Sequence, residues 1–500
     1  MSITESYAST DGAPDTGGAP ATTSREHAPP RRSRAWVMPL LLRIHFFAGI
    51  LVGPFILIAA LSGAVYVVTP QLERVVYAHE LSAPVTDTTL PIGDQVRIAE
   101  GYIGDAASLA AVRPAPAAGD TTRVMFAQEG LGPSQTRAVF VDPGTGEIRG
   151  DLTVYGTSGA LPLRAWVSDL HRNLHLGEPG RLYSEFAASW LGIVVVAGLA
   201  LWVVRLRTAR AKKDLFRPKR GARGYRRLFG WHASLGVWLV LGALFLSASG
   251  ITWSTYGGAN VSTLRAALSW QNPALSTALG DTGSGGAAGA HADHGVVAAP
   301  TAAVSPDTFD DVLAVARTEN VNVGLIEIRP PSAAGQAWVV QEIQRSFPTE
   351  VDGVAIDGDT LAVVDRVDFA DYPFMAKLAR WAVDLHMGSM FGLVNQFVLF
   401  VVAAGIATMV VLGYLMWWKR RPTRDPARRM GTVPGEALPN APVWGVALVV
   451  AVAIGIGYFL PLVGLPLAAF VIGDALVQGA RGRRARRSSS GGAETSVVRP

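Results

Sequence analysis

The feature that most constrains this 500-residue chain is a pair of histidine motifs, each of which occurs twice without gaps. In the first motif a histidine is followed by glycine at +4 and by Ser-Gly at +17 and +18, and its copies begin at His45 and His232. In the second, Asp-Leu-His is followed by glycine at +6 and +27, tryptophan at +31 and arginine at +34, and its histidines are His171 and His386. All four stretches lead into apolar runs long enough to cross a bilayer. Any fold of this chain must therefore place four matched histidines at membrane spans.

The two halves differ mainly by an insertion. The distance between the two motif histidines is 28 residues longer in the second half, and a Gly/Ala/Ser-rich stretch at about 277–305 has a similar length. Apart from this linker the halves are nearly the same size. The sequence therefore predicts an internal duplication, in which each half supplies one copy of each motif.

Composition indicates a membrane protein with extramembrane modules rather than one soluble domain. Hydrophobic residues make up 49% of the chain, and the mean hydropathy is +0.28. The pI near 9.5 does not indicate nucleic-acid binding, because arginine and lysine crowd into short segments beside apolar runs, at 205–227, 419–429 and 481–487. Such segments mark cytoplasmic loops, and binding of anionic lipids is a compatible second role.

The expected fold class is a mainly α membrane protein: an internally duplicated helical bundle of four core spans, a C-terminal hairpin and two extracytoplasmic α+β modules. Arginines before the first span place the N-terminus in the cytoplasm. Basic clusters flank the last apolar stretch on both sides, which favours two short crossings over one long tilted helix. The expected order is a disordered cytoplasmic leader (1–35), TM1 (36–69), outer module 1 (80–165), an outer histidine segment with TM2 (166–206), a basic loop (207–227), TM3 (228–256), the flexible linker (277–305), outer module 2 (306–380), an outer histidine segment with TM4 (381–418), a basic loop (419–440), the TM5–TM6 hairpin (442–479) and a disordered basic tail (480–500).

Both outer modules show a helix followed by short strands and turn residues. In the first module the pattern predicts a helix at Pro91–Tyr102 and strands at Arg123–Gln128, Thr136–Val141 and Glu147–Arg149. In the second it predicts a helix at Phe309–Arg317, strands at Leu325–Arg329 and Ala337–Ile343, and a hairpin of Val354–Asp357 with Leu361–Val364.

The chain has no cysteine. This excludes disulfides, thiolate catalysis, cysteine-ligated iron–sulfur clusters and covalent attachment of haem through cysteine. The chain also lacks a convincing Gly-rich dinucleotide fingerprint or Walker loop. A redox cofactor would therefore have to be held by histidine, methionine or tyrosine.

The topology sorts the four histidines into two pairs. His45 and His232 follow basic cytoplasmic segments, so both are expected near the inner face of the membrane. His171 and His386 precede spans that end in basic loops, so both are expected near the outer face. Two neutral imidazoles suit a six-coordinate haem iron, whereas zinc normally takes three or four protein ligands. The alternative is that each histidine is a hydrogen-bonded interfacial residue and that the nearby glycines serve helix packing.

His175 complicates the outer pair. It lies four residues after His171, on the same face if that segment is helical, but the second half has Met390 at the equivalent position. His175 is therefore an alternate ligand, a haem-propionate contact or a surface residue. Three arginines near the outer histidines are further candidates for contacts with haem propionates: Arg164, Arg172 and Arg181.

In these residues the chain resembles the PepSY-associated transmembrane family, which includes bacterial iron-regulated membrane proteins and ferric-siderophore reductases. The resemblance covers roughly residues 36–421. It rests on Arg43-Ile-His45, Leu61-Ser-Gly63, Leu170-His171-Arg172, Gly177-Glu-Pro-Gly-Arg181, Trp231-His232, Asp384-Leu-His386-Met-Gly388, Phe391-Gly392 and Trp417-Trp418-Lys-Arg-Arg421, in this order. It implies PepSY domains in the outer modules and a protein of the bacterial cytoplasmic membrane whose histidines hold two b-type haems. The long linker and His175 depart from the family pattern.

The leading hypothesis is an oxidoreductase that passes electrons across the membrane to an extracytoplasmic ferric chelate such as a ferric siderophore. Its expected partners are the lipid bilayer, the small chelate and an electron donor, either a quinol or a flavoprotein, but no nucleic acid. One alternative is a membrane-anchored module that binds peptides or regulates a protease, which would not need four matched histidines. The other is a metal or haem transporter, which the scarcity of intramembrane carboxylates disfavours.

Overall fold

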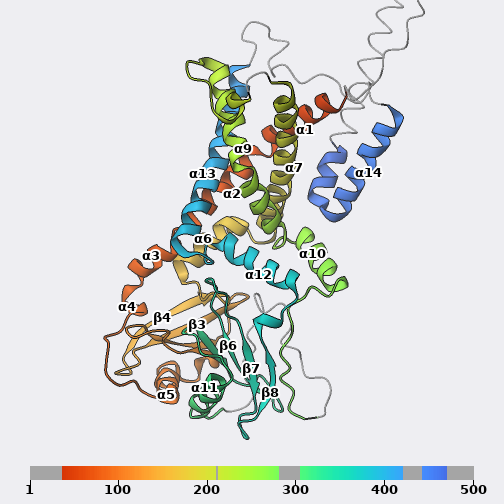
Figure 1. The fold of residues 1–500 in the computed structure, drawn as a ribbon. Coiled ribbons are helices and arrows are strands. Elements are labelled where there is room, and N and C mark those ends of the chain that lie inside the picture. Colours follow the sequence, from red (N-terminus) through yellow and green to blue (C-terminus); the bar gives the residue numbers. More distant parts are fainter. Residues whose placement is uncertain (1–35, 210–211, 281–303, 421–441, 470–500) are drawn as a thin grey trace, which may run out of the picture.

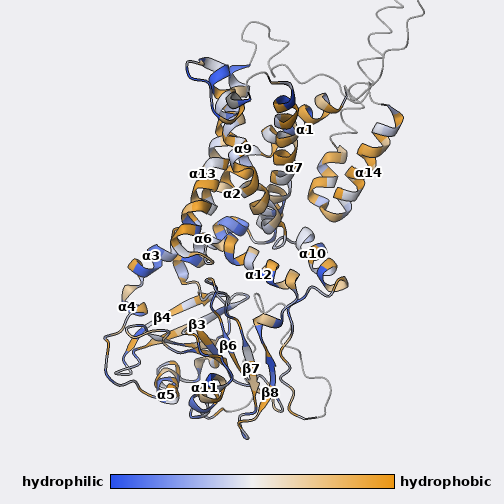
Figure 2. Cartoon of the chain, in the orientation of Figure 1, coloured by the Kyte–Doolittle hydropathy of each residue, from blue (hydrophilic) through white to orange (hydrophobic). Residues whose placement is uncertain are grey.

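The computed structural model describes residues 36–209, 212–280, 304–420 and 442–469. A bundle of apolar helices occupies one end of the molecule and a β-sheet with two covering helices occupies the other (Figure 1). Figure 2 shows that hydrophobic residues dominate the long helices, whereas the elements around the sheet are mixed. The leader, most of the linker, the 421–441 segment and the C-terminal tail predicted from the sequence lie outside the described residues.

Three helices in the described ranges are long and apolar enough to cross a membrane: α7 (Glu178–Thr208), α9 (Gly224–Ile251) and α13 (Gly392–Lys419). A fourth candidate span is broken into α1 (Val37–Leu51) and α2 (Gly53–Tyr66), whose axes differ by 61°. Pro54 stands in the first turn of α2, where it has no backbone N–H to continue the hydrogen-bonding of α1. The first span is thus bent, where the sequence predicted a single helix over 36–69.

The third span is shorter than predicted. The sequence placed its outer end at residue 256, but α9 ends at Ile251 and a new helix, α10 (Tyr256–Ala267), begins after a tight turn. The carboxylate of Glu185, fully buried on α7, accepts hydrogen bonds from the backbone amides of Tyr256 and Gly257, both at 2.9 Å. A carboxylate at the start of a helix accepts hydrogen bonds from the free backbone amides of the first turn. Glu185 therefore caps α10 and fixes where this helix begins.

Small residues let the spans pack closely. A Cβ on Gly242 of α9 would lie 2.8 Å from a methyl of Val402 on α13, and one on Gly405 of α13 would lie 2.6 Å from Leu239 on α9. These two positions serve helix–helix contact. The core of the bundle is otherwise built from alanine, valine and isoleucine side chains together with Trp190.

Two amphipathic helices lie between the spans and the sheet: α6 (Pro162–Asn173) and α12 (Phe374–Met387) (Figure 1). Each ends in a left-handed residue, Leu174 with φ +53° after α6 and Gly388 with φ +80° after α12. A left-handed residue terminates a helix and redirects the chain. Each amphipathic helix is therefore followed within a few residues by a long span.

The two α+β modules share one eight-stranded antiparallel sheet with the order β4-β3-β2-β1-β5-β6-β7-β8. The strands are β1 (Ser108–Arg113), β2 (Thr122–Ala127), β3 (Gln135–Val141), β4 (Ile148–Tyr155), β5 (Ile326–Arg329), β6 (Trp338–Glu342), β7 (Gly353–Ile356) and β8 (Val363–Val367). The modules join where β1 pairs with β5, with Val112 opposite Ile328. The sequence predicted two separate modules and missed β1, whose residues are almost all buried and so lack the alternation of a half-exposed strand.

Two helices, α5 (Ile92–Ile103) and α11 (Thr308–Thr318), cover one face of the sheet (Figure 1). Their apolar faces and the strands of both modules form one hydrophobic core. The remaining short elements are α3 (Thr69–Val76), α4 (Ala78–Leu81), η1 (Gly104–Ala106), α8 (Lys213–Phe216) and η2 (Phe369–Asp371). The two modules are therefore one folded unit.

The helix α14 (Val443–Phe459) packs beside the bundle. The chain turns at Leu460 and continues as helix over 461–469. The Cα of Gly464 lies 3.0 Å from the Cβ position of Gly457, so the two helical segments fold back on each other. The rest of the predicted TM5–TM6 hairpin, 470–479, lies outside the described residues.

Candidate functional site

The inner pair of histidines comes together inside the bundle. His45 on α1 and His232 on α9 have ring centroids 6.1 Å apart, with the ring planes at 74°. The Nδ1 of His45 lies 2.9 Å from the backbone carbonyl oxygen of Val194 on α7. Because a carbonyl only accepts hydrogen bonds, this contact assigns the ring proton to Nδ1 and leaves the lone pair of Nε2 available to a ligand.

His232 occupies the corresponding place between α9 and α13. The backbone acceptor beside His232 is the Met409 carbonyl, at the position in the repeat that matches Val194. This contact does not reach hydrogen-bond geometry, so Nδ1 of His232 is buried without a partner. Gly198 and Gly413, which also match in the repeat, face the two rings. A Cβ on Gly198 would lie 2.9 Å from Cε1 of His45, and one on Gly413 would lie 4.0 Å from Cε1 of His232.

The outer pair is held by serines. His171 projects from α6, and its Nδ1 lies 3.0 Å from the hydroxyl oxygen of Ser62 on α2. His386 projects from α12, and its Nδ1 lies 2.7 Å from the hydroxyl oxygen of Ser249 on α9. These are the serines that follow the inner histidines at +17 in the first motif. Each serine therefore connects a span that carries an inner histidine to an outer histidine of the same half.

Each serine hydroxyl also reaches a carbonyl within its own helix. The Ser62 hydroxyl donates to the carbonyl of Ile58, at 2.8 Å, and the Ser249 hydroxyl donates to that of Phe245, at 2.6 Å. With its one proton used in this way, the hydroxyl presents a lone pair to the imidazole. In this arrangement Nδ1 of each outer histidine carries the proton and the Nε2 lone pair is available.

The outer histidines line one cavity of about 230 Å³ between the spans, α6 and α12. A Cβ on Gly63 would lie 3.1 Å from Cε1 of His171, so this glycine gives the ring its space. Three arginines also line the cavity: Arg172, Arg181 and Arg345. The site thus offers two imidazoles and several cations in one enclosed space.

Residues 42–420 match the sequence profile of the family described as the PepSY-associated TM region. The chain belongs to this family. The matched region contains all four motif histidines, both serines and the whole sheet, and it ends before α14. No curated protein sequence matches the chain significantly. With several apolar helices of spanning length, this PepSY-associated protein is a multi-pass membrane protein.

The structure of the PepSY-associated chain does not bring His175 to the other histidines. His175 is exposed after the end of α6, with φ +57°, and its ring packs on Trp166 with centroids 4.8 Å apart. It is not among the residues that line the outer cavity. Arg164 also lies away from the cavity and pairs with Glu73 at 3.4 Å. Arg345, which does line it, belongs to no repeated motif, so nothing in the sequence pointed to it.

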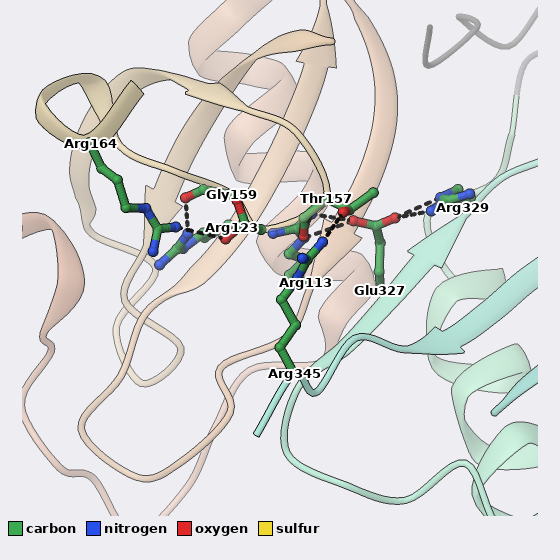
Figure 3. A network of polar contacts seen from close by, with 9 residues as sticks. Arg113, Arg123, Thr157, Gly159, Arg164, Glu327, Arg329 and Arg345 are labelled. Atoms are coloured by element: carbon green, nitrogen blue, oxygen red, sulfur yellow. Dashed lines mark hydrogen bonds and ion pairs between the residues drawn. The ribbon is translucent and has the colours of Figure 1, made fainter. Parts of the chain in front are cut away.

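An arginine-rich network joins the two modules of the PepSY-associated protein (Figure 3). Glu327 on β5 is buried between Arg113 of β1, at 2.6 Å, and Arg329, also at 2.6 Å. Burial raises the pKa of Glu327, but the two guanidinium groups outweigh burial and lower it to about 2. Burial, with Arg113 and Arg164 nearby, lowers the pKa of Arg123 to about 10. The network therefore has a surplus of positive charge.

No group of three or more histidine, aspartate or glutamate side chains in the described ranges could hold a bare metal ion. The inner and outer pairs each offer two imidazoles and no carboxylate ligand. Such a donor set is incomplete for zinc, which needs three or four protein ligands. It is complete for a metal whose remaining coordination positions are filled by a macrocycle.

Proposed function

We propose that this protein carries electrons across the membrane with two b-type haems and reduces an extracytoplasmic ferric chelate, such as a ferric siderophore. His45 and His232 would hold the inner haem, and His171 and His386 the outer one. The observation that carries the proposal is that the histidine rings share one pattern of hydrogen bonding. Three of the four have Nδ1 bound to an oxygen acceptor and Nε2 available.

The inner pair has a separation that suits an iron between two imidazoles. The ring centroids of His45 and His232 are 6.1 Å apart, so the two imidazoles would hold one haem iron between them. Gly198 has no room for a Cβ beside His45, so the ring is confined. The unpartnered Nδ1 of His232 is a buried polar atom that a small displacement toward Met409 would satisfy.

The outer pair offers cationic side chains as well as imidazoles. Arg172 and Arg181 line the same cavity as His171 and His386, and guanidinium groups pair well with carboxylates such as haem propionates. This favours the sequence hypothesis for these two arginines. It does not favour it for Arg164, which binds Glu73 instead.

Haem bound at these positions would supply one-electron redox chemistry. The protein's own part is to hold the imidazoles, to fix their protons on Nδ1 through Val194, Ser62 and Ser249, and to exclude water from the site. Each ferric ion accepts one electron, which a quinol or flavoprotein at the cytoplasmic side would supply. The ferrous ion binds oxygen ligands more weakly than the ferric ion, so the chelate releases its metal. The internal duplication and the bacterial cytoplasmic-membrane location are parts of this proposal.

The test is an optical spectrum of the detergent-purified protein, oxidised and then reduced with dithionite, with haem quantified per chain. We expect sharp b-type bands and two haems per chain. His45→Ala and His386→Ala should each remove one haem, whereas His175→Ala should leave both. A colourless protein from haem-replete cells would overturn the proposal and leave the membrane-anchored binding module as the better hypothesis.

A further inference from the structure

A second cavity, of about 380 Å³, lies next to the outer histidines. It is enclosed by α10 and the segment that follows it, by α12, and by the face of β6 and β7 opposite α11. Its lining contains five arginines, which define it here as the arginine cavity: Arg181, Arg265, Arg329, Arg345 and Arg380. A cavity with this many guanidinium groups is built to attract anions.

Few carboxylates oppose these arginines. Glu342 is the one acidic residue in the described lining, and its side chain is nearly fully buried, with Oε1 accepting from the backbone amides of Asn322 and Val323. Arg345 and Arg380 both pair with the carboxylate of Asp384, at 3.5 and 3.0 Å, and Arg181 lies 3.9 Å from the exposed carboxylate of Glu178. Among the described residues, the five arginines of the cavity therefore outnumber the carboxylates that pair with them.

Arg329 adds to this imbalance. Its carboxylate partner, Glu327, is the same group that binds Arg113, as Figure 3 shows. Glu327 thus binds two arginines, as Asp384 does.

Arg265 on α10 has no carboxylate partner among the described residues. Its Nε and one terminal nitrogen donate to the carbonyl of Trp270, at 3.4 and 3.2 Å. A backbone carbonyl fixes the direction of the guanidinium group but does not neutralise its charge. The remaining donors form the planar fork that binds a carboxylate through two parallel hydrogen bonds.

The arginine cavity adjoins the outer-histidine cavity. Thr157, Arg181, Trp253, Ser254 and Arg345 line both. A molecule held by the arginines would therefore lie beside the outer histidine pair. Hydroxyl and amide side chains such as Ser262, Gln271 and Asn272 complete its polar lining, which suits a hydrophilic, oxygen-rich ligand.

We propose that the arginine cavity is the substrate site and that it selects anionic polycarboxylate chelates of ferric iron over neutral or cationic ones. This inference rests on the proposed function and narrows its substrate class. Anionic lipid headgroups share the same oxyanion chemistry. One wall of the cavity is formed by Val339, Gln341 and Gly353 of the sheet, which favours a small soluble anion over a headgroup that remains attached to its acyl chains.

The test uses gallium(III) citrate, which resembles ferric citrate but is not reduced. Its binding to the full-length protein in nanodiscs of phosphatidylcholine is measured by calorimetry. We expect binding to the wild-type protein and about tenfold weaker binding to Arg265→Gln, because one charge-assisted contact is lost. Arg317→Gln is the matched control, since Arg317 is exposed on α11, which covers the opposite face of the sheet. A neutral gallium trihydroxamate complex should not bind.

Arg265→Lys keeps the charge without the planar fork, so its affinity for gallium citrate should lie between those of the wild type and Arg265→Gln. Equal thermal unfolding midpoints show that the variants are folded. Equal citrate affinity in Arg265→Gln and the wild type would overturn the inference. So would displacement of gallium citrate by phosphatidylglycerol added to the nanodiscs, which would assign the cavity to lipid. Because gallium accepts no electron, citrate binding by a colourless protein would retain the inference as a binding site while the electron-transfer function failed. A protein that contains two haems but does not bind gallium citrate would retain the electron-transfer function and overturn the binding-site inference.

Discussion

The hydroxyl oxygen of Ser62 lies 3.0 Å from Nδ1 of His171, and the same relationship, at 2.7 Å, links Ser249 to His386. In both cases the serine donates its own proton to a carbonyl one helical turn earlier. In this arrangement the serine accepts and the histidine donates from Nδ1. A hydrogen bond of this kind orients a metal-ligating imidazole and raises its basicity.

Under the proposed function, replacing the serine should weaken haem binding at the outer histidine pair. In Ser62→Ala the Nδ1–H of His171 loses its acceptor, and we expect about tenfold weaker haem binding at the outer site. The measurement is haem titration of the reduced protein, followed by its optical bands. Ser62→Thr keeps the hydroxyl and should bind haem like the wild type. Equal haem affinity in Ser62→Ala and the wild type would contradict a positioning role for this serine.

Gly198 and Gly413 provide a matched pair at the inner site. An alanine at 198 would place its Cβ 2.9 Å from Cε1 of His45, closer than van der Waals contact allows, whereas one at 413 would stand 4.0 Å from Cε1 of His232. We expect Gly198→Ala to lower the haem content toward one per chain and Gly413→Ala to keep two. The haem-to-protein ratio of the purified variants measures this. An equal loss of haem in Gly198→Ala and Gly413→Ala would show that the glycines act through helix packing alone.

The sequence was most informative where structure follows from local patterns. The length of the apolar runs located the spans, and the alternation of apolar and polar residues located six of the eight strands. The strand β1 was missed, and only the first few residues of β4 were predicted. Two features were missed. Val112 and Ile328, which join the modules into one sheet, are 216 positions apart, so no local pattern could reveal their pairing. The bend between α1 and α2 occurs at Pro54, a local signal that the length of the apolar run does not register.

For the candidate site, the sequence predicted the histidine pairs but not the groups that bind them. The repeat indicated which histidines form each pair, and the structure brings His45 and His232 into contact and places His171 and His386 in one cavity. The repeat also contained Ser62 and Ser249, although their spacing alone does not reveal that they bind the outer histidines. The Val194 acceptor is a backbone carbonyl and therefore leaves no trace in residue identity.

The junction of the two modules can be tested at Asp310 on α11. Its carboxylate accepts from the backbone amides of Ile92 and Gly93, both at 2.8 Å, and so caps α5 of the other module. Asp310→Ala should lower the free energy of unfolding by about 1–2 kcal/mol, seen as a lower thermal midpoint. Asp311→Ala, one residue further along and exposed, is the control. A similar small effect of both variants would mean that the cap does not stabilise the junction.

Acid should weaken the same junction through Glu327. Its pKa is about 2 in the folded protein, below the ordinary value near 4.5, so its charged form stabilises the fold above pH 4.5 and this contribution is lost as the pH falls toward 2. We expect a loss of roughly 3 kcal/mol over this range from Glu327 alone. Glu327→Gln should be less stable than the wild type at neutral pH, because Arg113 and Arg329 lose their shared partner, but should lose less stability on acidification. Thermal midpoints of both proteins between pH 7 and about pH 3 measure this, and parallel pH profiles would show that other carboxylates dominate the acid response.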